Sequence, residues 1–268
     1  MYESFFGMTH TPFARDVPVE MLFESNAMTE TLARLNYVAK RQLFAVVTAD
    51  PGCGKSTLLR RFCQELPKEE YIVLYLSDSK LTPRWFYNGM LSQLGLESKF
   101  YRGDSKRLLQ QEIEIIQGVQ KKKVVCILDE AHLLEKDTLE EFRFLLNYRF
   151  DSMSPMALVL VGQTELWEDK LKLQRYTAIR QRIDMYCTLP HLDRSETEQY
   201  IRRHLEYAGC AQEVFTDKAL EEIHRASSGI PRMVNRIGEK AFLYAYQRQK
   251  RLIDDHTIRY VVEHEFLL

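Results

Sequence analysis

The sequence predicts an α/β fold in which a parallel five-stranded sheet is flanked by helices and followed by a small all-helical domain. Short apolar runs alternate with segments of helical periodicity up to residue 189, which is the pattern of strand–helix–strand units. A loop of small residues separates the first apolar run from the next helix, and beyond residue 195 only helical periodicity remains. We therefore expect an N-terminal arm over residues 1–28 that packs on the α/β core, an α/β domain over 29–190 and a helical lid domain over 191–268.

The composition is that of a globular protein with balanced charge. The 268 residues include 37 Lys and Arg against 38 Asp and Glu, for a net charge of −1. This balance argues against a globally basic nucleic-acid-binding protein but is compatible with a local basic surface. No apolar run approaches the roughly 20 residues that span a bilayer, and the N-terminus has no basic signal segment. We expect a cytoplasmic protein with no membrane partner. Its five scattered cysteines predict reduced thiols.

The first elements are an aromatic-rich arm and a helix. Phe5, Phe6 and Phe13 alternate with proline and glycine, so the arm is expected to be irregular. It either only packs on the α/β domain or also covers a purine base bound there, because purines stack on aromatic side chains. Residues 27–41 then carry apolar side chains at helical spacing.

A phosphate-binding loop joins the first strand, 44–48, to a helix that begins near Lys55 and ends at about residue 65. Backbone N–H groups of such a loop, together with the positive end of the helix, bind the β- and γ-phosphates of a nucleotide. Lys55 supplies a charge to these phosphates, and the Ser56 hydroxyl is placed to bind Mg²⁺. Ala49 stands where the full motif has its first glycine, and a positive φ there would be strained. The residues expected to contact the nucleotide are Pro51, Gly52, Cys53, Gly54, Lys55, Ser56 and Thr57.

Two acidic residues follow the third strand directly. The elements before that strand are predicted at 71–76 (strand), 83–94 (helix), 97–107 (polar loop) and 105–119 (helix). The third strand, 124–128, ends in Asp129-Glu130-Ala131-His132. This placement suits Asp129 as a ligand of hydrated Mg²⁺ and Glu130 as a general base for the attacking water. For His132, packing and a chemical role both remain open.

Gln163 ends the fourth strand, 157–162, which follows a helix predicted over 136–150. Ligands bind at the carboxyl ends of parallel strands, so this side chain would lie beside the γ-phosphate and the attacking water. A polar residue of an ordinary turn is the alternative.

A helix over 168–182 carries Arg180 and Arg182 near its end and leads to the fifth strand, 185–189. From the residues alone, either arginine is as well explained by contact with solvent.

Beyond Pro190 the chain is all helical, with helices predicted over 195–208, 217–227, 231–248 and 255–263. Pro231 occupies the first position of the third of these helices, where its missing N–H costs no hydrogen bond. Arg232 follows on the first turn and can point back toward the γ-phosphate.

Taken together, these features resemble an AAA+ ATPase over almost the whole chain. The phosphate-binding loop corresponds to Walker A, the Asp-Glu pair to Walker B, and the helical region with Gly-x-Pro-Arg to the lid. More narrowly, the chain resembles the ExeA/GspA branch, which is related to the TniB, TnsC and IstB-type ATPases of transposons. The residues that carry this resemblance are Phe5-Phe6-Gly7, Pro12-Phe13, Asp129-Glu130-Ala131-His132-Leu133-Leu134, Leu145-Leu146-Asn147-Tyr148, Val161-Gly162-Gln163-Thr164-Glu165-Leu166 and Gln181-Arg182-Ile183.

The resemblance implies further roles. Gln163 would be sensor 1 and Arg232 sensor 2, and an arginine before the fifth strand would reach the γ-phosphate of a neighbouring subunit. Arg182 fits that position best, with Arg180 as the alternative. ATP and Mg²⁺ would be the cofactors, and the assembly would be a homo-oligomer, either a ring or a helical filament. The catalytic set would be Lys55, Glu130, Gln163, Arg180, Arg182 and Arg232.

In a ring of such subunits, the loops after the second strand and after the next helix would face the central channel. Repeated around the ring, their cations would contact the phosphates of double-stranded DNA without reading its sequence. A solvated surface charge is the alternative for each of them. The candidates are Lys80, Thr82, Arg84, Lys99, Arg102 and Lys106.

We therefore expect an ATP-dependent DNA-binding ATPase that oligomerises on target DNA and recruits or activates a transposase. Secretion-type members of the branch continue into a membrane helix and a cell-wall-binding region, whereas this sequence ends after the lid, which favours the mobile-element branch. The alternatives are a secretion-assembly or other protein-remodelling ATPase that does not bind DNA, and a module similar to a clamp loader or helicase loader.

Overall fold

The structure is a computed structural model that describes residues 2–14, 16–77, 81–146 and 154–265. Contacts divide the chain into two compact units. The α/β unit comprises Met28–Pro51 and Leu58–Leu189. The helical unit comprises Met1–Ala27, Gly52–Thr57 and Pro190–Leu268.

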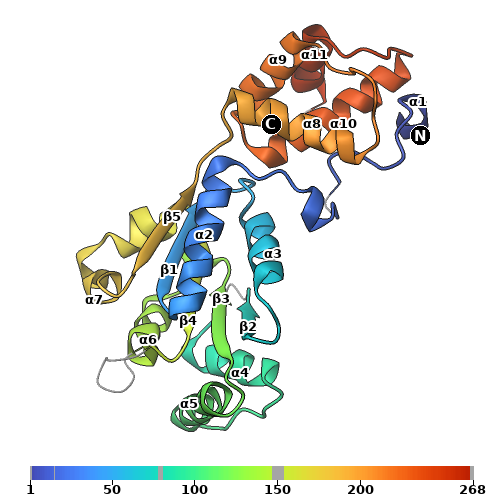
Figure 1. Cartoon of the computed structure of the whole chain (residues 1–268). Coiled ribbons are helices and arrows are strands. Elements are labelled where there is room, and N and C mark those ends of the chain that lie inside the picture. Colours follow the sequence, from blue (N-terminus) through green and yellow to red (C-terminus); the bar gives the residue numbers. More distant parts are fainter. Residues whose placement is uncertain (1, 15, 78–80, 147–153, 266–268) are drawn as a thin grey trace. The chain divides into compact units, whose positions relative to one another are not determined.

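Five parallel strands form a single sheet in the α/β unit (Figure 1). The inner strands are almost completely buried, which explains why they read in the sequence as continuous apolar runs. All five predicted strands are present, with ends that agree to within one residue. In spatial order the strands are β2 (Tyr71–Leu76), β3 (Lys123–Leu128), β4 (Ala157–Gly162), β1 (Phe44–Ala49) and β5 (Met185–Leu189).

The strand order brings three carboxyl ends together. β4 pairs with β1 on one side and with β3 on the other, in a register that sets Thr48 beside Gly162 and Leu128 beside Leu160. The residues that follow these strands are therefore neighbours at one edge of the sheet, where parallel α/β folds bind their ligands.

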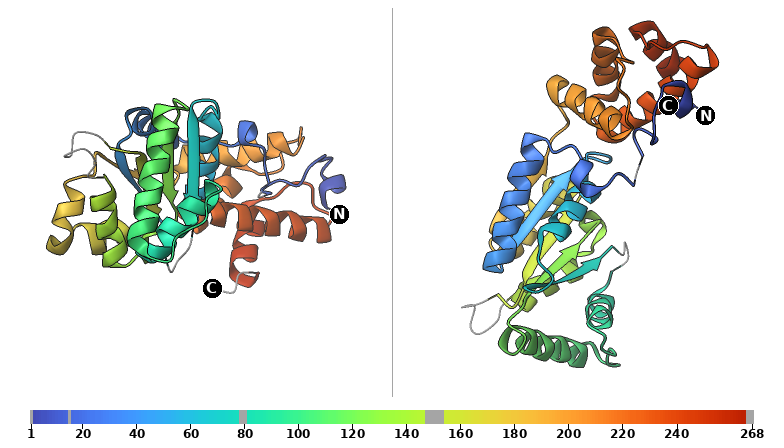
Figure 2. Two further views of the ribbon diagram at one scale, coloured as in Figure 1. Left: turned by 90° about the horizontal axis from the view of Figure 1, so that it is seen from below. Right: turned by 45° about the vertical axis from the view of Figure 1, so that its right-hand side comes forward.

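Helices surround this sheet, as Figures 1 and 2 show. Their apolar faces bury Phe86, Phe142 and Leu109 against the strands. α5 begins three residues before the predicted start, because Ser105 is buried inside the helix and exchanges hydrogen bonds with the backbone of Lys99. The helices are α2 (Asn26–Arg41), α3 (Lys55–Glu65), α4 (Pro83–Gln93), α5 (Arg102–Gly118), α6 (Lys136–Leu146) and α7 (Thr177–Arg180).

The segment before β5 differs from the continuous helix that the sequence predicts over 168–182. It consists of a π-helix, Leu166–Leu171, a 3₁₀ turn, Gln174–Tyr176, and the short α7. The buried side chains Leu166 and Leu171 lie five residues apart, at the two ends of the π-helix. This spacing fits the wider π turn better than a 3.6-residue period, so the prediction of one regular helix was wrong.

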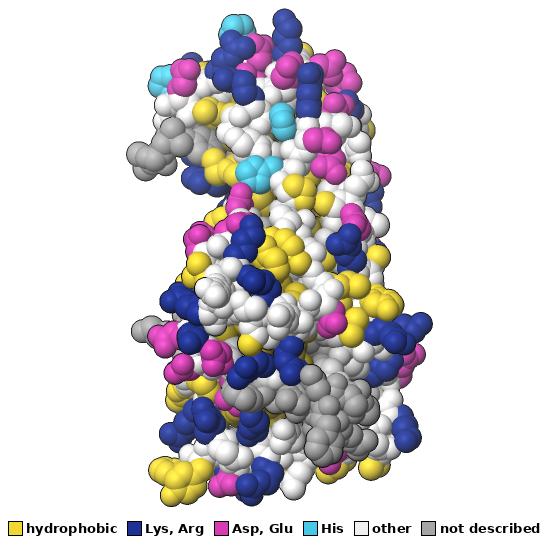
Figure 3. All heavy atoms as spheres, turned by 90° about the vertical axis from the view of Figure 1, so that its left-hand side faces the viewer, with side chains coloured by type: hydrophobic (Ala, Val, Ile, Leu, Met, Phe, Trp, Pro, Cys, Tyr) yellow, Lys and Arg dark blue, Asp and Glu magenta, His cyan; other side chains and the backbone are white. Residues whose placement is uncertain are grey.

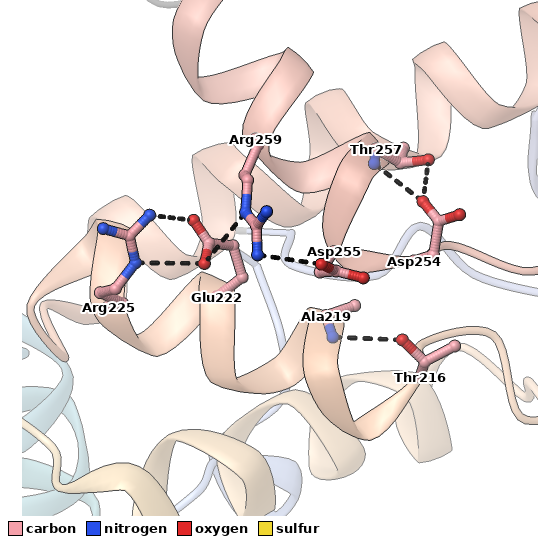
Figure 4. A network of polar contacts seen from close by, with 8 residues as sticks. All are labelled: Thr216, Ala219, Glu222, Arg225, Asp254, Asp255, Thr257 and Arg259. Atoms are coloured by element: carbon pink, nitrogen blue, oxygen red, sulfur yellow. Dashed lines mark hydrogen bonds and ion pairs between the residues drawn. The ribbon is translucent and has the colours of Figure 1, made fainter.

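Four helices of the helical unit agree with the prediction to within one residue: α8 (Arg194–Tyr207), α9 (Asp217–Ser227), α10 (Pro231–Gln247) and α11 (Asp255–His264). Figure 4 shows how polar contacts join α9 and α11. The buried carboxylate of Glu222 pairs with Arg225 on its own helix and with Arg259 on α11. The hydrogen bonds from Arg225 and the charge of both guanidinium groups lower the pKa of Glu222. Asp254 caps α11 by accepting from the Thr257 backbone N–H at 2.8 Å.

The N-terminal arm contradicts the expectation that it packs on the α/β core. Its helix α1 (Tyr2–Phe5) and the residues after it belong to the helical unit, where the Tyr2 ring stacks on Phe242 with centroids 5.5 Å apart. Phe6 packs edge-on against the same ring at 5.0 Å. Tyr2, Phe6 and Phe13 of the arm are buried in one apolar cluster with Phe242, so the arm is part of the core of the helical unit.

Gly238 makes room for this arm. A Cβ on Gly238 would overlap Cε2 of the Phe13 ring, so Gly238→Ala requires the ring to move. We expect Gly238→Ala to destabilise the protein by about 1–3 kcal/mol, measured by urea unfolding followed by circular dichroism. Gly118→Ala in α5 is the matched control, because nothing lies within 4 Å of its Cβ position. Equal stability of the two variants would contradict the seating of Phe13 on α10.

Candidate nucleotide-binding and catalytic site

The loop after β1 has the backbone shape that its glycines predict. Gly52 and Gly54 have φ angles of 90° and 91°, a region that strains any residue with a side chain. Ala49 is buried as the last residue of β1, and its φ is not positive. The alanine that replaces the usual first glycine therefore costs no backbone strain.

The helix α3 begins at Lys55, directly after the loop, so the backbone N–H groups of its first turn are not used within the helix. Lys55 itself is only 9% exposed. Of the other predicted nucleotide contacts, Cys53 is buried, Gly52, Gly54 and Thr57 are half-buried, and Pro51 and Ser56 are exposed.

Arg232 lies beside this loop within the helical unit. Its backbone N–H donates to the carbonyl oxygen of Gly52 at 3.2 Å. A Cβ on Gly52 would come within 2.8 Å of the Arg232 Cβ, so the glycine also permits this close approach. The Arg232 side chain is exposed on the first turn of α10, as the sequence predicts.

Asp129 directly follows β3, and both of its carboxylate oxygens accept hydrogen bonds. Oδ2 accepts from the Tyr75 hydroxyl at 2.8 Å, and Oδ1 accepts from the Glu130 backbone N–H at 2.9 Å. Burial and the hydrogen bond to Asp129 raise the pKa of Tyr75 to about 12, so the phenol keeps its proton and remains a donor. Sequence reasoning missed Tyr75, since an aromatic residue inside a strand reads as packing.

Glu130 has an unusual backbone for a residue with a side chain. Its φ is 53°, in the left-handed region, and its side chain is 44% exposed. One carboxylate oxygen lies 3.4 Å from Nδ1 of His132. Such a conformation costs energy and marks sites where the surrounding structure dictates the backbone.

The turn after β4 contacts both neighbouring loops. The Gln163 backbone N–H lies 3.3 Å from Nδ1 of His132, and the Thr164 hydroxyl donates to Asp50 at 2.7 Å. The Gln163 side chain is half-buried. Sequence reasoning identified Gln163 but missed Asp50 and Thr164, because side-chain hydrogen bonds between distant loops leave no periodic signal.

The two candidate arginine fingers differ in their local contacts. Arg180 donates to the carbonyl oxygens of Leu171 and Lys172 at 3.1 and 2.6 Å, so it closes the end of the π-helix. Arg182 is half-buried in the turn that follows α7, where its backbone N–H bonds to Ile179.

The candidate DNA contacts lie on a surface that combines cationic, acidic and aromatic side chains. The guanidinium of Arg84 lies 5.5 Å from the centre of the exposed Phe100 ring, and the backbone N–H of exposed Lys99 bonds to Ser105. Arg102 and Lys106 both pair with the buried Glu141, at 3.7 and 2.8 Å.

The remaining members of this surface are Thr82 and Lys80. Thr82 caps α4, whereas Lys80 lies outside the described residues, as do Asn147 and Tyr148. Trp85, Phe100 and Tyr101 are 60%, 76% and 69% exposed beside these cations. A cavity of about 420 Å³ between the first turns of three helices is lined by Thr82, Pro83, Arg84, Arg102, Asp137, Glu140 and Glu141. On the face shown in Figure 3, Lys and Arg are interspersed with Asp and Glu.

Comparison with known proteins supports the fold. Residues 38–168 match the family described as AAA domain. General secretion pathway protein A of Aeromonas hydrophila is 33% identical over 252 residues, which make up 92% of this chain and 45% of that protein. The chain thus spans less than half the length of that relative. This likeness bears out the ExeA/GspA part of the resemblance, whereas the relation to transposon ATPases stays a prediction.

Two solved structures share the fold at low identity. Drosophila ORC bound to DNA aligns with 100% of this chain and 65% of its own at a TM-score of 0.67 and 16% identity. Cdc6p from Pyrobaculum aerophilum aligns with 94% of this chain and 68% of its own, at a TM-score of 0.65 and 16% identity. The predicted α/β fold of an AAA P-loop ATPase is therefore confirmed. None of the described helices is both long and apolar enough to cross a bilayer.

Proposed function

We propose that this chain binds Mg·ATP at the Walker A loop and hydrolyses it with Glu130 as the general base. The observation that supports this most is the bonding of the Gln163–Thr164 turn. Thr164 donates to Asp50 at the start of the Walker A loop, and Gln163 contacts His132, two residues past Glu130. These bonds fix the start of the phosphate-binding loop relative to the loop that carries the base, which is what in-line attack on a phosphate requires.

The side chains divide the work. Lys55 neutralises phosphate charge, and Ser56 and Asp129 are the oxygen ligands that Mg²⁺ prefers. Among the described residues, no group of three or more His, Cys, Asp or Glu could hold a metal ion. The ion supplies charge stabilisation on the phosphoryl oxygens. Glu130 accepts the proton of the attacking water, and Gln163 and Arg232 contact the γ-phosphate.

Hydrolysis is completed between subunits in this proposal. Arg182 of one subunit reaches the γ-phosphate bound by its neighbour, so that activity depends on assembly of a homo-oligomer, as a ring or a filament. Arg180 is the alternative candidate, and its guanidinium donates to the carbonyl oxygens of Leu171 and Lys172 at the end of the π-helix.

The ATP-bound oligomer would assemble on double-stranded DNA and recruit or activate a transposase. The surface of Arg84, Lys99 and Arg102 supports DNA contact, since its cations are exposed and exposed aromatic rings accompany them. The shared fold with an ORC structure that contains DNA is consistent with this proposal. Lys106 is left out, because its half-buried ammonium group lies 2.8 Å from Glu141, whereas Arg102 lies 3.7 Å from Glu141 and its side chain stays exposed.

DNA binding across a salt series tests this proposal, with ADP, with a non-hydrolysable ATP analogue and without nucleotide. We expect large complexes only in the ATP state, with an affinity that falls steeply as salt rises. Replacing Arg84, Lys99 and Arg102 together by Ala should weaken DNA binding about 10-fold or more and flatten the salt slope. The control removes three exposed lysines elsewhere, Lys68, Lys172 and Lys218. Equal DNA binding by both triple variants would remove the proposed surface.

A second candidate function is supported by the 33% identical secretion pathway relative. In that case the ATPase would act on protein partners in secretion assembly rather than on DNA. Assembly with ATP but no DNA binding at low salt would favour this function, and the partner would then be sought among proteins.

A further inference from the structure

Contacts with the backbone of His132 and Leu134 hold the loop that carries Glu130. Lys170 lies in the π-helix, and its ammonium group donates to the carbonyl oxygens of His132 and Leu134. Gly162, the last residue of β4, packs against the backbone of His132, where a Cβ would lie 3.0 Å from the His132 nitrogen. His132 therefore stands on a rigid backbone between β3 and β4, and its side chain is 11% exposed.

One ring nitrogen of His132 lies near both a hydrogen-bond donor and a hydrogen-bond acceptor. Nδ1 lies 3.3 Å from the Gln163 backbone N–H, which is a donor, and 3.4 Å from Oε2 of Glu130, which is an acceptor. A ring nitrogen carries either a lone pair or a proton. Nδ1 can therefore serve only one of these neighbours at a time.

We infer that His132 is a positioning residue for the general base, which alternates between holding the Glu130 carboxylate and bonding to the turn after β4. When Nδ1 accepts from Gln163, it carries no proton, and the carboxylate of Glu130 has no support from the ring. When Nδ1 donates to one oxygen of Glu130, the carboxylate is held in place, and its other oxygen accepts the proton of the attacking water. The inference rests on the proposed ATPase function and adds a link between the γ-phosphate-contacting turn and the base.

The hydrogen bond between Thr164 and Asp50 connects the contact between Gln163 and His132 to the nucleotide-binding loop. Asp50 begins the Walker A loop, and Thr164 is the residue after Gln163. A shift of the Walker A loop on binding phosphate would move the Gln163 N–H relative to His132. The Glu130 backbone is itself in the left-handed region, a conformation that the surrounding structure has to stabilise.

Three substitutions of His132 in the full chain test the inference. His132→Asn keeps an amide near the position of Nδ1, His132→Gln places one near Nε2, and His132→Phe removes both. In single-turnover ATP hydrolysis we expect His132→Phe and His132→Gln to lower the rate about 10- to 100-fold. His132→Asn should restore most of it. The affinity for a fluorescent ATP analogue should stay close to that of the unsubstituted protein in all three. His256→Phe, an exposed histidine on α11, is the control.

A double-mutant cycle with Glu130→Gln separates positioning from general packing. If His132 acts through the carboxylate, His132→Phe should not lower the residual rate of the Glu130→Gln variant any further. A hydrolysis rate of His132→Phe equal to that of the unsubstituted protein would overturn the inference. So would equal losses for Asn, Gln and Phe accompanied by weaker ATP binding or a lower Tm. The proposed function fails separately, if the unsubstituted protein hydrolyses ATP no faster than Lys55→Ala.

Discussion

Glu130→Gln is expected to lower kcat for ATP hydrolysis about 10²- to 10⁴-fold, the usual contribution of a general base. The amide has nearly the same shape but cannot accept the proton of the attacking water. ATP affinity should be unchanged, because the Walker A loop, Lys55 and Asp129 are untouched. The measurements are steady-state phosphate release and titration with a fluorescent ATP analogue.

Glu114→Gln is the matched control for this variant, since it removes an exposed carboxylate of α5. It should hydrolyse ATP at the unsubstituted rate. A Glu130→Gln variant that retains more than about a tenth of kcat would assign the base elsewhere. If it instead loses ATP binding, Glu130 would be needed for the site to form rather than for the chemical step.

Arg182→Ala is expected to lower assembly-dependent hydrolysis about 10³- to 10⁵-fold, the effect of an arginine that stabilises charge on the transferring phosphoryl group. Because this arginine acts on the neighbour's nucleotide, two inactive variants should complement one another. A mixture of Arg182→Ala and Glu130→Gln subunits contains sites with an intact base and an intact arginine, so activity should return. The measurement is phosphate release over a range of mixing ratios.

Comparing Arg180→Ala with Arg182→Ala identifies which arginine acts on the neighbour's nucleotide. It removes hydrogen bonds to two carbonyl oxygens at the end of the π-helix, so we expect a loss of about 1–3 kcal/mol of stability with hydrolysis largely kept. If Arg180→Ala abolishes hydrolysis at normal stability while Arg182→Ala does not, the roles are exchanged. Absence of complementation in the mixtures would mean that neither arginine acts between subunits.

The fold was predictable because its signals are local. Each inner strand is buried on both faces and therefore reads as an apolar run, and each strand of the sheet was found to within one residue. Capping residues such as Asp254 marked the starts of helices in the helical unit. The segment before β5 was mispredicted, because the sequence there looks helical while the chain forms a π-helix, a 3₁₀ turn and the short α7.

The candidate site was predictable only where chemistry and chain position coincide. Lys55, Asp129, Glu130 and Gln163 each follow a strand directly or begin the helix after it, and strand ends of a parallel sheet meet at one edge. Tyr75 gave no such signal, since its hydroxyl reaches Asp129 only across the β2–β3 pair.

The sequence by itself determined the order of strands and helices, the phosphate-binding loop and the acidic pair, because these depend on residues adjacent in the chain. Only the tertiary structure decided that the arm belongs to the helical unit. Apolar aromatic residues do not specify which core they enter, and here the open side of α10 at Gly238 accepts Phe13. Tertiary structure likewise decided that His132 stands between Glu130 and Gln163, since β3 and β4 become neighbours only when the sheet forms.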